Sequence, residues 1–211
     1  ETHGTSVASI LVGNEHPVFK GIITEAKLYA ASVFFTMPSG EVAATTESLI
    51  LALDWLVQQD VPIINMSLSG PENKLLEIAT KRVMEKGIVI VAAVGNAGPN
   101  AKPLYPAAYS GVVAVTAVDK NHQAYLRANR GDYVTFAALG VDIIAAKASG
   151  GYHQQTGTSI AAPFVSAILT NIAGTEQIHT YLQQLKENTI DLGPPGFDDI
   201  YGYGLIQAIS E

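Results

Sequence analysis

The chain has 211 residues, 48% of them apolar and 15% charged, which is enough for one α/β domain with a sizeable core. The net charge of −7 and the lack of a Lys/Arg cluster argue against nucleic acid or an anionic membrane surface as the main partner. No apolar run reaches membrane length, no signal peptide opens the sequence, and the absence of cysteine excludes disulfides and zinc–thiolate sites. We therefore expect a single domain over residues 1–211.

Strand and helix patterns alternate along the chain, which predicts an α/β fold with a mostly parallel sheet and helices on both faces. The strand runs are nearly continuously apolar, as expected for strands that helices cover on both sides. In chain order we predict a strand at residues 27–34, a helix at 47–57 that follows Thr46, a strand at 63–67, a helix at 75–86 that stops at Gly87, and strands at 88–94 and 112–118. A late hairpin of residues 133–137 and 141–146 and a surface helix at 178–188 follow.

Three short segments carry side chains that suit nucleophilic catalysis. His3, followed by Gly4 and Thr5, stands directly before a small-residue, apolar helical run. A buried-strand pattern ends at Gly95 in a turn that points the amide of Asn96 outwards. Ser159 lies at the start of an apolar run that continues to residue 173. A hydroxyl nucleophile needs a base for its proton and donors for the oxyanion it creates, and these three segments offer those groups.

Ser159 is expected near the first position of a helix. A proline is tolerated where its missing N–H is not needed, so Pro163 is assigned to the first turn and the helix to a start near Thr158. The positive end of a helix favours a developing negative charge at the Ser159 side chain and backbone N–H. Taken alone, a helix cap explains this serine equally well.

Together, the His-Gly-Thr block at His3, the Gly-Asn pair at Asn96 and the Gly-Thr-Ser-x-Ala-x-Pro block at Ser159 resemble the subtilisin-like serine proteases, peptidase family S8. The blocks occur in the family's order, and the resemblance runs from Thr2 to about Ala208. It implies a three-layer subtilisin-like fold and a serine endopeptidase that works through an acyl-enzyme. Ser159 would be the nucleophile and His3 the general base, while the Asn96 side chain and the Ser159 N–H would hold the oxyanion, supported by the Thr158 hydroxyl.

The triad aspartate of the family precedes the histidine, and this sequence has no aspartate before His3. Asp54 and Asp60 lie in a helical pattern away from any matching block, so neither is assigned as the triad acid. We therefore expect a partial catalytic domain that lacks the first strand or strands, and that is nearly inactive by itself. An unpaired sheet edge would then allow self-association.

Substrate binding, by the same resemblance, would pair an extended peptide with an edge segment formed by Ser67, Leu68, Ser69 and Gly70. Residues 39–42 match the segment on the other side of the peptide. The walls of the main specificity pocket would come from Ala92, Ala93 and Val94. Leu104 stands where relatives often have a small residue, and it would shorten the pocket.

The expected partners and location follow from the same family. We expect a polypeptide substrate, with a propeptide or inhibitor as a further partner, and a secreted or periplasmic location. No cofactor and no bound metal are expected, because the loop after the first helix, residues 12–20, offers few oxygen ligands. His16, His122, His153 and His179 match no block and are expected at the solvated surface.

Three other readings compete with a protease. The first is a non-catalytic subtilisin-like module that binds peptides, favoured by the missing aspartate. The second is an α/β-hydrolase esterase, which should carry Gly-x-Ser-x-Gly ahead of its histidine. The third is a nucleotide-binding doubly wound domain, which needs a glycine-rich loop after its first strand. The sequence contains neither of these two motifs.

Overall fold

The computed structural model describes residues 2–15, 19–170 and 175–208, so His16 and the end of the apolar run at 171–173 lie outside the described residues. The helices are α1 (Thr2–Val12), α2 (Thr46–Gln58), α3 (Lys74–Met84), α4 (Thr158–Thr170) and α5 (Thr175–Glu187). The strands are β1 (Asn14–Glu15), β2 (Phe19–Lys20), β3 (Phe34–Thr36), β4 (Val42–Ala44), β5 (Ile63–Met66), β6 (Val89–Ala93), β7 (Val113–Val118), β8 (Phe136–Leu139), β9 (Ile143–Ala146) and β10 (Tyr152–Gln155).

The central sheet has four parallel strands in the order β5-β6-β7-β8. Every residue of β6 and β7 is buried, because helices cover both faces. The strands predicted at 63–67, 88–94 and 112–118 are therefore confirmed, with ends that differ by at most one residue.

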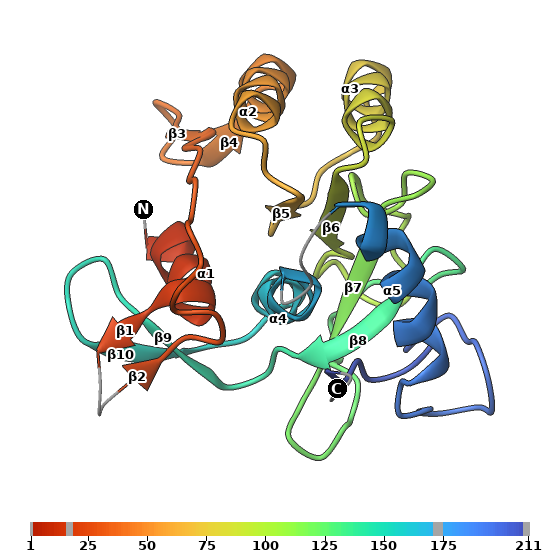
Figure 1. Cartoon of the computed structure of the whole chain (residues 1–211). Coiled ribbons are helices and arrows are strands. Elements are labelled where there is room, and N and C mark those ends of the chain that lie inside the picture. The colour runs from red at the N-terminus through yellow and green to blue at the C-terminus, as the bar shows by residue number, and fades with distance from the viewer. Residues whose placement is uncertain (1, 16–18, 171–174, 209–211) are drawn as a thin grey trace.

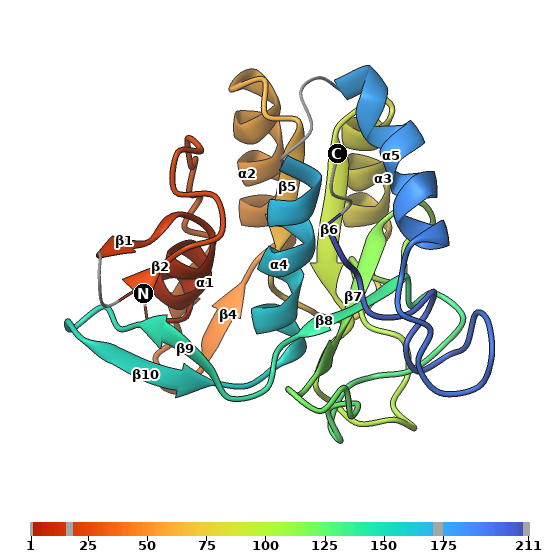
Figure 2. The same cartoon turned by 60° about the horizontal axis from the view of Figure 1, so that its bottom comes forward.

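Two helix layers enclose this sheet (Figures 1 and 2). On one face, Leu53 of α2 and Leu76 of α3 join a core with alternate side chains of β5 and β6. On the other face, Val165 of α4 and Leu185 of α5 pack against β6, β7 and β8. The predicted α/β fold, with a mostly parallel sheet between two layers of helices, is confirmed.

The first helix, α1, lies outside these layers, beside α4 and two small antiparallel pairs, β1-β2 and β9-β10 (Figure 1). Ile10 of α1, Ala145 of β9 and Ile160 of α4 form a separate small core there. Through this core, the start of the chain packs against the helix that carries Ser159.

The predicted strand at 27–34 is wrong. Residues 27–33 form no ladder, and only Phe34 enters a strand, β3, which pairs with β4 in an exposed hairpin. An apolar run favours burial of a segment, but a strand also needs a neighbouring segment to which its backbone can hydrogen-bond. Among the described residues, none pairs with 27–33.

The predicted hairpin of 133–137 and 141–146 is also wrong. β8 pairs in parallel with β7, while β9 pairs with β10, so the two predicted partners belong to different sheets. They separate at Gly140, where a Cβ would lie 2.8 Å from the Gly157 carbonyl oxygen and 2.9 Å from Ala161 Cβ. Gly140 thus lets the chain pass close to the start of α4.

The helix predictions hold with small corrections. Thr45, one residue before the predicted cap, is the N-cap of α2 and forms a capping box with Ser48. The helix predicted at 178–188 is α5, but its inner face is buried, with Ile178 and Leu185 at 0% exposure. None of the helices in the described part of the chain is long and apolar enough to cross a membrane.

Candidate active site

The predicted catalytic residues come together where two strands end and two helices begin. Ser67 follows β5 and Asn96 lies just beyond β6, both at the carboxyl edge of the parallel sheet. His3 and Ser159 are each the second residue of a helix, α1 and α4. The predicted helix start at Thr158 is confirmed.

The Asn96 side chain is fixed by Thr158. Its Oδ1 accepts hydrogen bonds from the backbone N–H of Thr158 at 3.0 Å and from the Thr158 hydroxyl at 3.1 Å. The same hydroxyl accepts from the N–H of Gly95 at 3.1 Å. Thr158 is fully buried, so it orients the amide rather than presenting its hydroxyl to a ligand.

Gly157 leaves open the space that Asn96 and Ser159 share. A Cβ added to Gly157 would lie 3.3 Å from Asn96 Nδ2 and 3.4 Å from Ser159 Oγ. A side chain at this position would therefore crowd both polar atoms. Within the described residues, neither Asn96 Nδ2 nor the Ser159 N–H donates a hydrogen bond. The Asn96 amide donor and the Ser159 hydroxyl thus lie close to one point in front of Gly157.

Pro163 lies inside α4 rather than in its first turn, so that detail of the sequence prediction is wrong. In a helix, the N–H of residue 163 would bond to the carbonyl oxygen of Ser159, and proline has no such donor. The hydroxyl of Ser67 takes this place and donates to Ser159 O at 2.7 Å. The proline therefore opens a hydrogen-bond position that ties the backbone of Ser159 to the end of β5.

A half-buried polar relay supports Ser67, and the sequence analysis missed it. Ser166 Oγ donates to Asn65 Oδ1 at 3.0 Å, and Asn65 Nδ2 donates to Ser67 Oγ at 2.9 Å. The available signal was a single asparagine inside an otherwise apolar strand, since buried polar groups are nearly always paired. The relay links the middle of α4 to its first turn through β5.

His3 is exposed and does not bond to Ser159. Its Nε2 lies 3.1 Å from the carbonyl oxygen of Ser67. A carbonyl oxygen only accepts, so this contact requires a proton on Nε2, whereas a base that takes the Ser159 proton through Nε2 needs that nitrogen bare. The ring must therefore change tautomer, or turn, before it can act as that base.

A carboxylate that could set this tautomer is absent from the described residues. The ion pairs within them join Lys74 to Glu77 and Lys81 to Glu85, and no described carboxylate bonds to His3. In a Ser-His-Asp triad, the acid accepts from Nδ1–H and so leaves Nε2 free. Asp54 and Asp60 lie in and after α2 and do not contact the site.

The helix that carries His3 is held by β9 and β10, the strand pair that precedes α4. Ser6 Oγ donates to the carbonyl oxygen of Ala146 at 3.0 Å, and the Ala146 N–H donates to Ser9 Oγ at 3.0 Å. His153 is half-buried, with Nε2 3.0 Å from Ser6 Oγ, so the expectation of a solvated histidine is wrong there. Both backbone groups of Ala146 are thus bonded to α1.

The predicted substrate segment has two free positions. Gly70 exchanges hydrogen bonds with Tyr105, at 2.8 and 2.9 Å. The backbones of Leu68 and Ser69 make no hydrogen bond to other described residues. Residues 67–69 run beside the 92–94 segment, since Met66 pairs with Ala92. Ala92 and Val94 belong to the core on the α2 and α3 face, and Ala93 is 2% exposed.

Leu104 and Ser69 both lie close to Gly95. A Cβ on Gly95 would lie 2.5 Å from Leu104 Cδ1 and 3.4 Å from Ser69 Oγ. Gly95 also has φ +102°, a conformation that glycine adopts most readily. The leucine side chain therefore packs directly against the residue that precedes Asn96.

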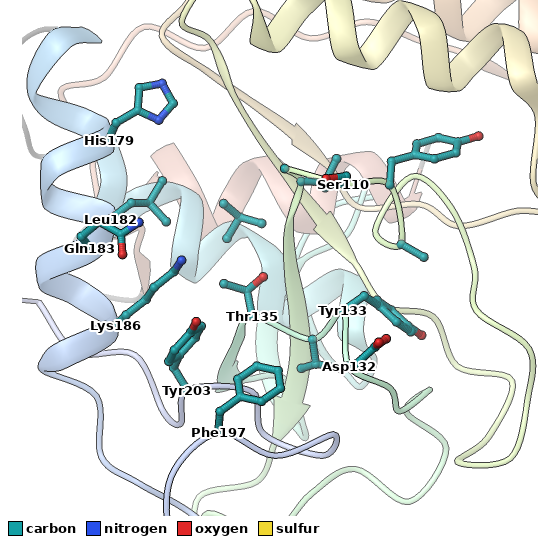
Figure 3. Close-up of a pocket in the computed structure, with 16 residues that line it drawn as sticks. Ser110, Asp132, Tyr133, Thr135, His179, Leu182, Gln183, Lys186, Phe197 and Tyr203 are labelled. Atoms are coloured by element: carbon teal, nitrogen blue, oxygen red, sulfur yellow. The ribbon is translucent and has the colours of Figure 1, made fainter.

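No metal-binding cluster forms in the described parts of the chain, where no three His, Cys, Asp or Glu side chains gather. A pocket of about 470 Å³ lies elsewhere, between α5, the starts of β7 and β8, and the C-terminal tail (Figure 3). Lys186 Nζ lies 5.0 Å from the centre of the Tyr203 ring at its wall. None of the predicted catalytic residues lines this pocket.

Comparison with known proteins identifies relatives among proteases. The chain is 37% identical to "Minor extracellular protease Epr" of Bacillus subtilis over 97% of its own length and 32% of that protein. It is 31% identical to "Subtilisin DY" of Bacillus licheniformis, over 97% of the chain and 75% of that protein. The chain thus spans about a third of Epr and three quarters of Subtilisin DY.

Solved structures give the same answer. The structure named "S41 Psychrophilic Protease" matches with a TM-score of 0.85 and 26% identity, over 99% of this chain and 78% of that chain. "Structure of Patellamide maturation protease PatA" matches with a TM-score of 0.82 and 27% identity, over 98% of this chain and 80% of that one. The family model Peptidase_S8, "Subtilase family", matches residues 1–204. The chain therefore belongs to the subtilase family.

Proposed function

We propose that this chain is the core of a serine endopeptidase that hydrolyses peptide bonds through an acyl-enzyme. The observation that carries the proposal is the common space in front of Gly157, faced by Ser159 Oγ and Asn96 Nδ2. Ser159 Oγ attacks the peptide carbonyl, and His3 accepts its proton and passes it to the leaving amine. Asn96 Nδ2 and the Ser159 N–H bind the oxyanion, and water then hydrolyses the ester.

The substrate is a polypeptide in extended conformation. The free backbone groups of Leu68 and Ser69 are available to pair with it as a neighbouring strand pairs with a sheet edge. Leu104 limits the depth of the pocket for the side chain before the cleaved bond. The acid that orients His3 comes from outside the described residues, because no described carboxylate bonds to the imidazole.

A secreted or periplasmic location goes with this function. The similarity to a protease whose name calls it extracellular supports this location. A propeptide or inhibitor would occupy the same cleft as the substrate.

The experiment is labelling of the full-length protein with a serine-directed phosphonyl fluoride, followed by peptide mapping. Ser159 is expected to be the labelled residue, because only an activated hydroxyl reacts quickly. Ser159→Ala should abolish labelling and peptide hydrolysis, whereas Ser32→Ala, at an exposed serine, should change neither. Labelling of another residue, or full peptidase activity in Ser159→Ala, contradicts the assignment.

The second candidate function is a peptide-binding module without catalysis. The hydrogen bond from His3 to Ser67 O favours it, because this tautomer cannot accept a proton at Nε2. Such a module would bind extended peptides, leave them intact, and not react with the phosphonyl fluoride.

A further inference from the structure

We propose that Asn129 is a positioning residue. It holds the Asn96 amide, which binds the oxyanion, and Leu104, which limits the specificity pocket, in fixed positions relative to each other. The inference rests on the proposed protease function. Asn129 lies in the loop between β7 and β8, and it is fully buried at 0% exposure. Its polar groups therefore need partners within the protein.

Two of these partners flank Asn96 in the sequence. The Asn129 N–H donates to the carbonyl oxygen of Gly95 at 3.1 Å. The Ala97 N–H donates to Asn129 Oδ1 at 2.9 Å. The residues before and after Asn96 are thus both bonded to one buried asparagine, which restrains the backbone that aims the Asn96 side chain.

The third partner belongs to the specificity pocket. Asn129 Nδ2 donates to the carbonyl oxygen of Lys102 at 3.0 Å, two residues before Leu104. Leu104 Cδ1 and Asn129 Oδ1 both lie close to the point where a Cβ on Gly95 would be, at 2.5 and 3.4 Å. A single side chain therefore connects the loop that carries Asn96 with the loop that carries Leu104.

Asn129 does not face the common space in front of Gly157, so it acts on the reaction only through Asn96 and Leu104. The amide oxygen of the Asn96 side chain is held by Thr158, the first residue of α4. Asn96 is thus fixed twice, through its Oδ1 by Thr158 and through its backbone by Asn129. Loss of the second restraint lets the amide drift, and displacements of about 1 Å cost up to about 100-fold in rate.

A double-mutant cycle tests this role in the full-length protein. Asn129→Ala should lower kcat by about 10- to 100-fold, and the same change in an Asn96→Ala background should cost less than about twofold. The matched control is Asn73→Ala. Asn73 caps α3, where it accepts from the N–H groups of Leu75 and Leu76, so its loss lowers Tm without touching Asn96. Equal losses in the two backgrounds would overturn the proposal.

Asn129→Asp adds a pH readout that a merely structural role would not give. A protonated carboxyl reproduces both the acceptor toward Ala97 and the donor toward Lys102, whereas a carboxylate only accepts. The titratable side chain beside this carboxyl, Tyr133, has its own pKa raised by burial and so stays neutral over the range tested. Burial also raises the pKa of the carboxyl at position 129. The ratio of variant to parent kcat/KM should therefore fall as pH rises through this pKa, and a constant ratio contradicts the proposal.

Amide hydrogen exchange separates this inference from the proposed function. The Ala97 N–H should exchange at least about tenfold faster in Asn129→Ala and unchanged in Asn73→Ala, because only the first loses its acceptor. If the protein shows neither peptidase activity nor labelling at Ser159, the proposed function is refuted, but the exchange of the Ala97 N–H can still be measured. If the exchange rate of the Ala97 N–H is unchanged in Asn129→Ala, the positioning role of Asn129 is overturned, whatever the peptidase activity.

Discussion

The hydroxyl of Ser67 and the carbonyl oxygen of Ser159 are joined by a 2.7 Å hydrogen bond across 92 residues of sequence. Ser67→Ala leaves that carbonyl without a donor in a half-buried position, so the free energy of unfolding should fall by about 1 to 3 kcal/mol. Denaturant unfolding measures this change. Ser32→Ala, at an exposed serine, should stay within about 0.5 kcal/mol.

Pro163 provides the internal check on this bond. Pro163→Ala supplies the N–H that the helix lacks, so Ser159 O gains a second donor. In that background Ser67→Ala should cost less than in the parent. An equal cost in both backgrounds would show that Ser67 acts elsewhere.

Asn96→Ala should lower kcat by about two to three orders of magnitude and leave KM nearly unchanged, a magnitude known from a subtilisin, which belongs to this same family. The amide acts mainly on the oxyanion of the transition state, so the loss appears in kcat. Steady-state kinetics on one peptide measures it, with Asn100→Ala, at an exposed position nearby, as control. A change confined to KM contradicts the role.

Leu104→Gly should widen the specificity of the protease toward large aromatic side chains before the cleaved bond. The parent should prefer small or medium apolar residues there, because Leu104, which packs against Gly95, is proposed to shorten the specificity pocket. About 1 to 3 kcal/mol of discrimination is at stake. A peptide library profiles both proteins, and Leu126→Gly, at a leucine 82% exposed, is the control. A parent that favours Phe or Tyr shows that Leu104 points elsewhere.

Tyr109 links alkaline stability to the start of α3. Its hydroxyl donates to the Asn73 carbonyl oxygen at 2.7 Å and accepts from the Asn73 N–H at 3.1 Å. Burial raises the pKa of Tyr109. The stability due to the neutral phenol is therefore present below the unfolded value of about 10 and is lost as pH rises through the folded pKa.

Tyr109→Phe should accordingly lower the free energy of unfolding by about 0.5 to 1.5 kcal/mol at neutral pH. Above about pH 10, the difference between the two proteins should shrink, because only the parent loses the contribution of this phenol. Urea unfolding at several pH values measures both effects. A difference that grows with pH contradicts the assignment.

The 211-residue chain alone should hydrolyse peptides only at a trace rate. Loss of the triad acid lowers kcat about 3 × 10⁴-fold. This figure was measured on a subtilisin, a member of the same family. The rate of peptide hydrolysis is compared with that of a version extended upstream as far as the next strand that ends in an acidic residue. Equal rates would mean that another residue or a partner chain orients His3.

Burial explains which parts of the fold could be predicted from sequence. The runs that became β6 and β7 are apolar on both faces, and the structure covers both faces with helices. Residues 27–33 have a similar composition but find no strand neighbour among the described residues, and residues 133–146 divide between two sheets. Pairing depends on distant parts of the chain, which local composition does not encode.

The candidate site divides in the same way. The resemblance of three motif blocks to the subtilisin-like proteases predicted Ser159, Asn96 and His3 as catalytic residues, and these roles stay predictions. The Ser67 hydroxyl, Asn65 and Asn129 make hydrogen bonds to segments far apart in sequence, namely to Ser159, Ser166 and Ala97. The sequence shows only polar residues in apolar surroundings there, and their partners appear once the chain has folded.

The hydrogen bonds around Ser67 and Asn96 also bear on folding kinetics. His3 contacts Ser67 across 64 residues, Asn96 contacts Thr158 across 62, and Ser67 contacts Ser159 across 92. Each contact closes a long loop, whose entropy cost precedes any stabilisation, so chains rich in such contacts fold slowly. The candidate site should therefore assemble only when the sheet and α4 are already packed, and a folding chain should acquire reactivity at Ser159 after it acquires helical structure.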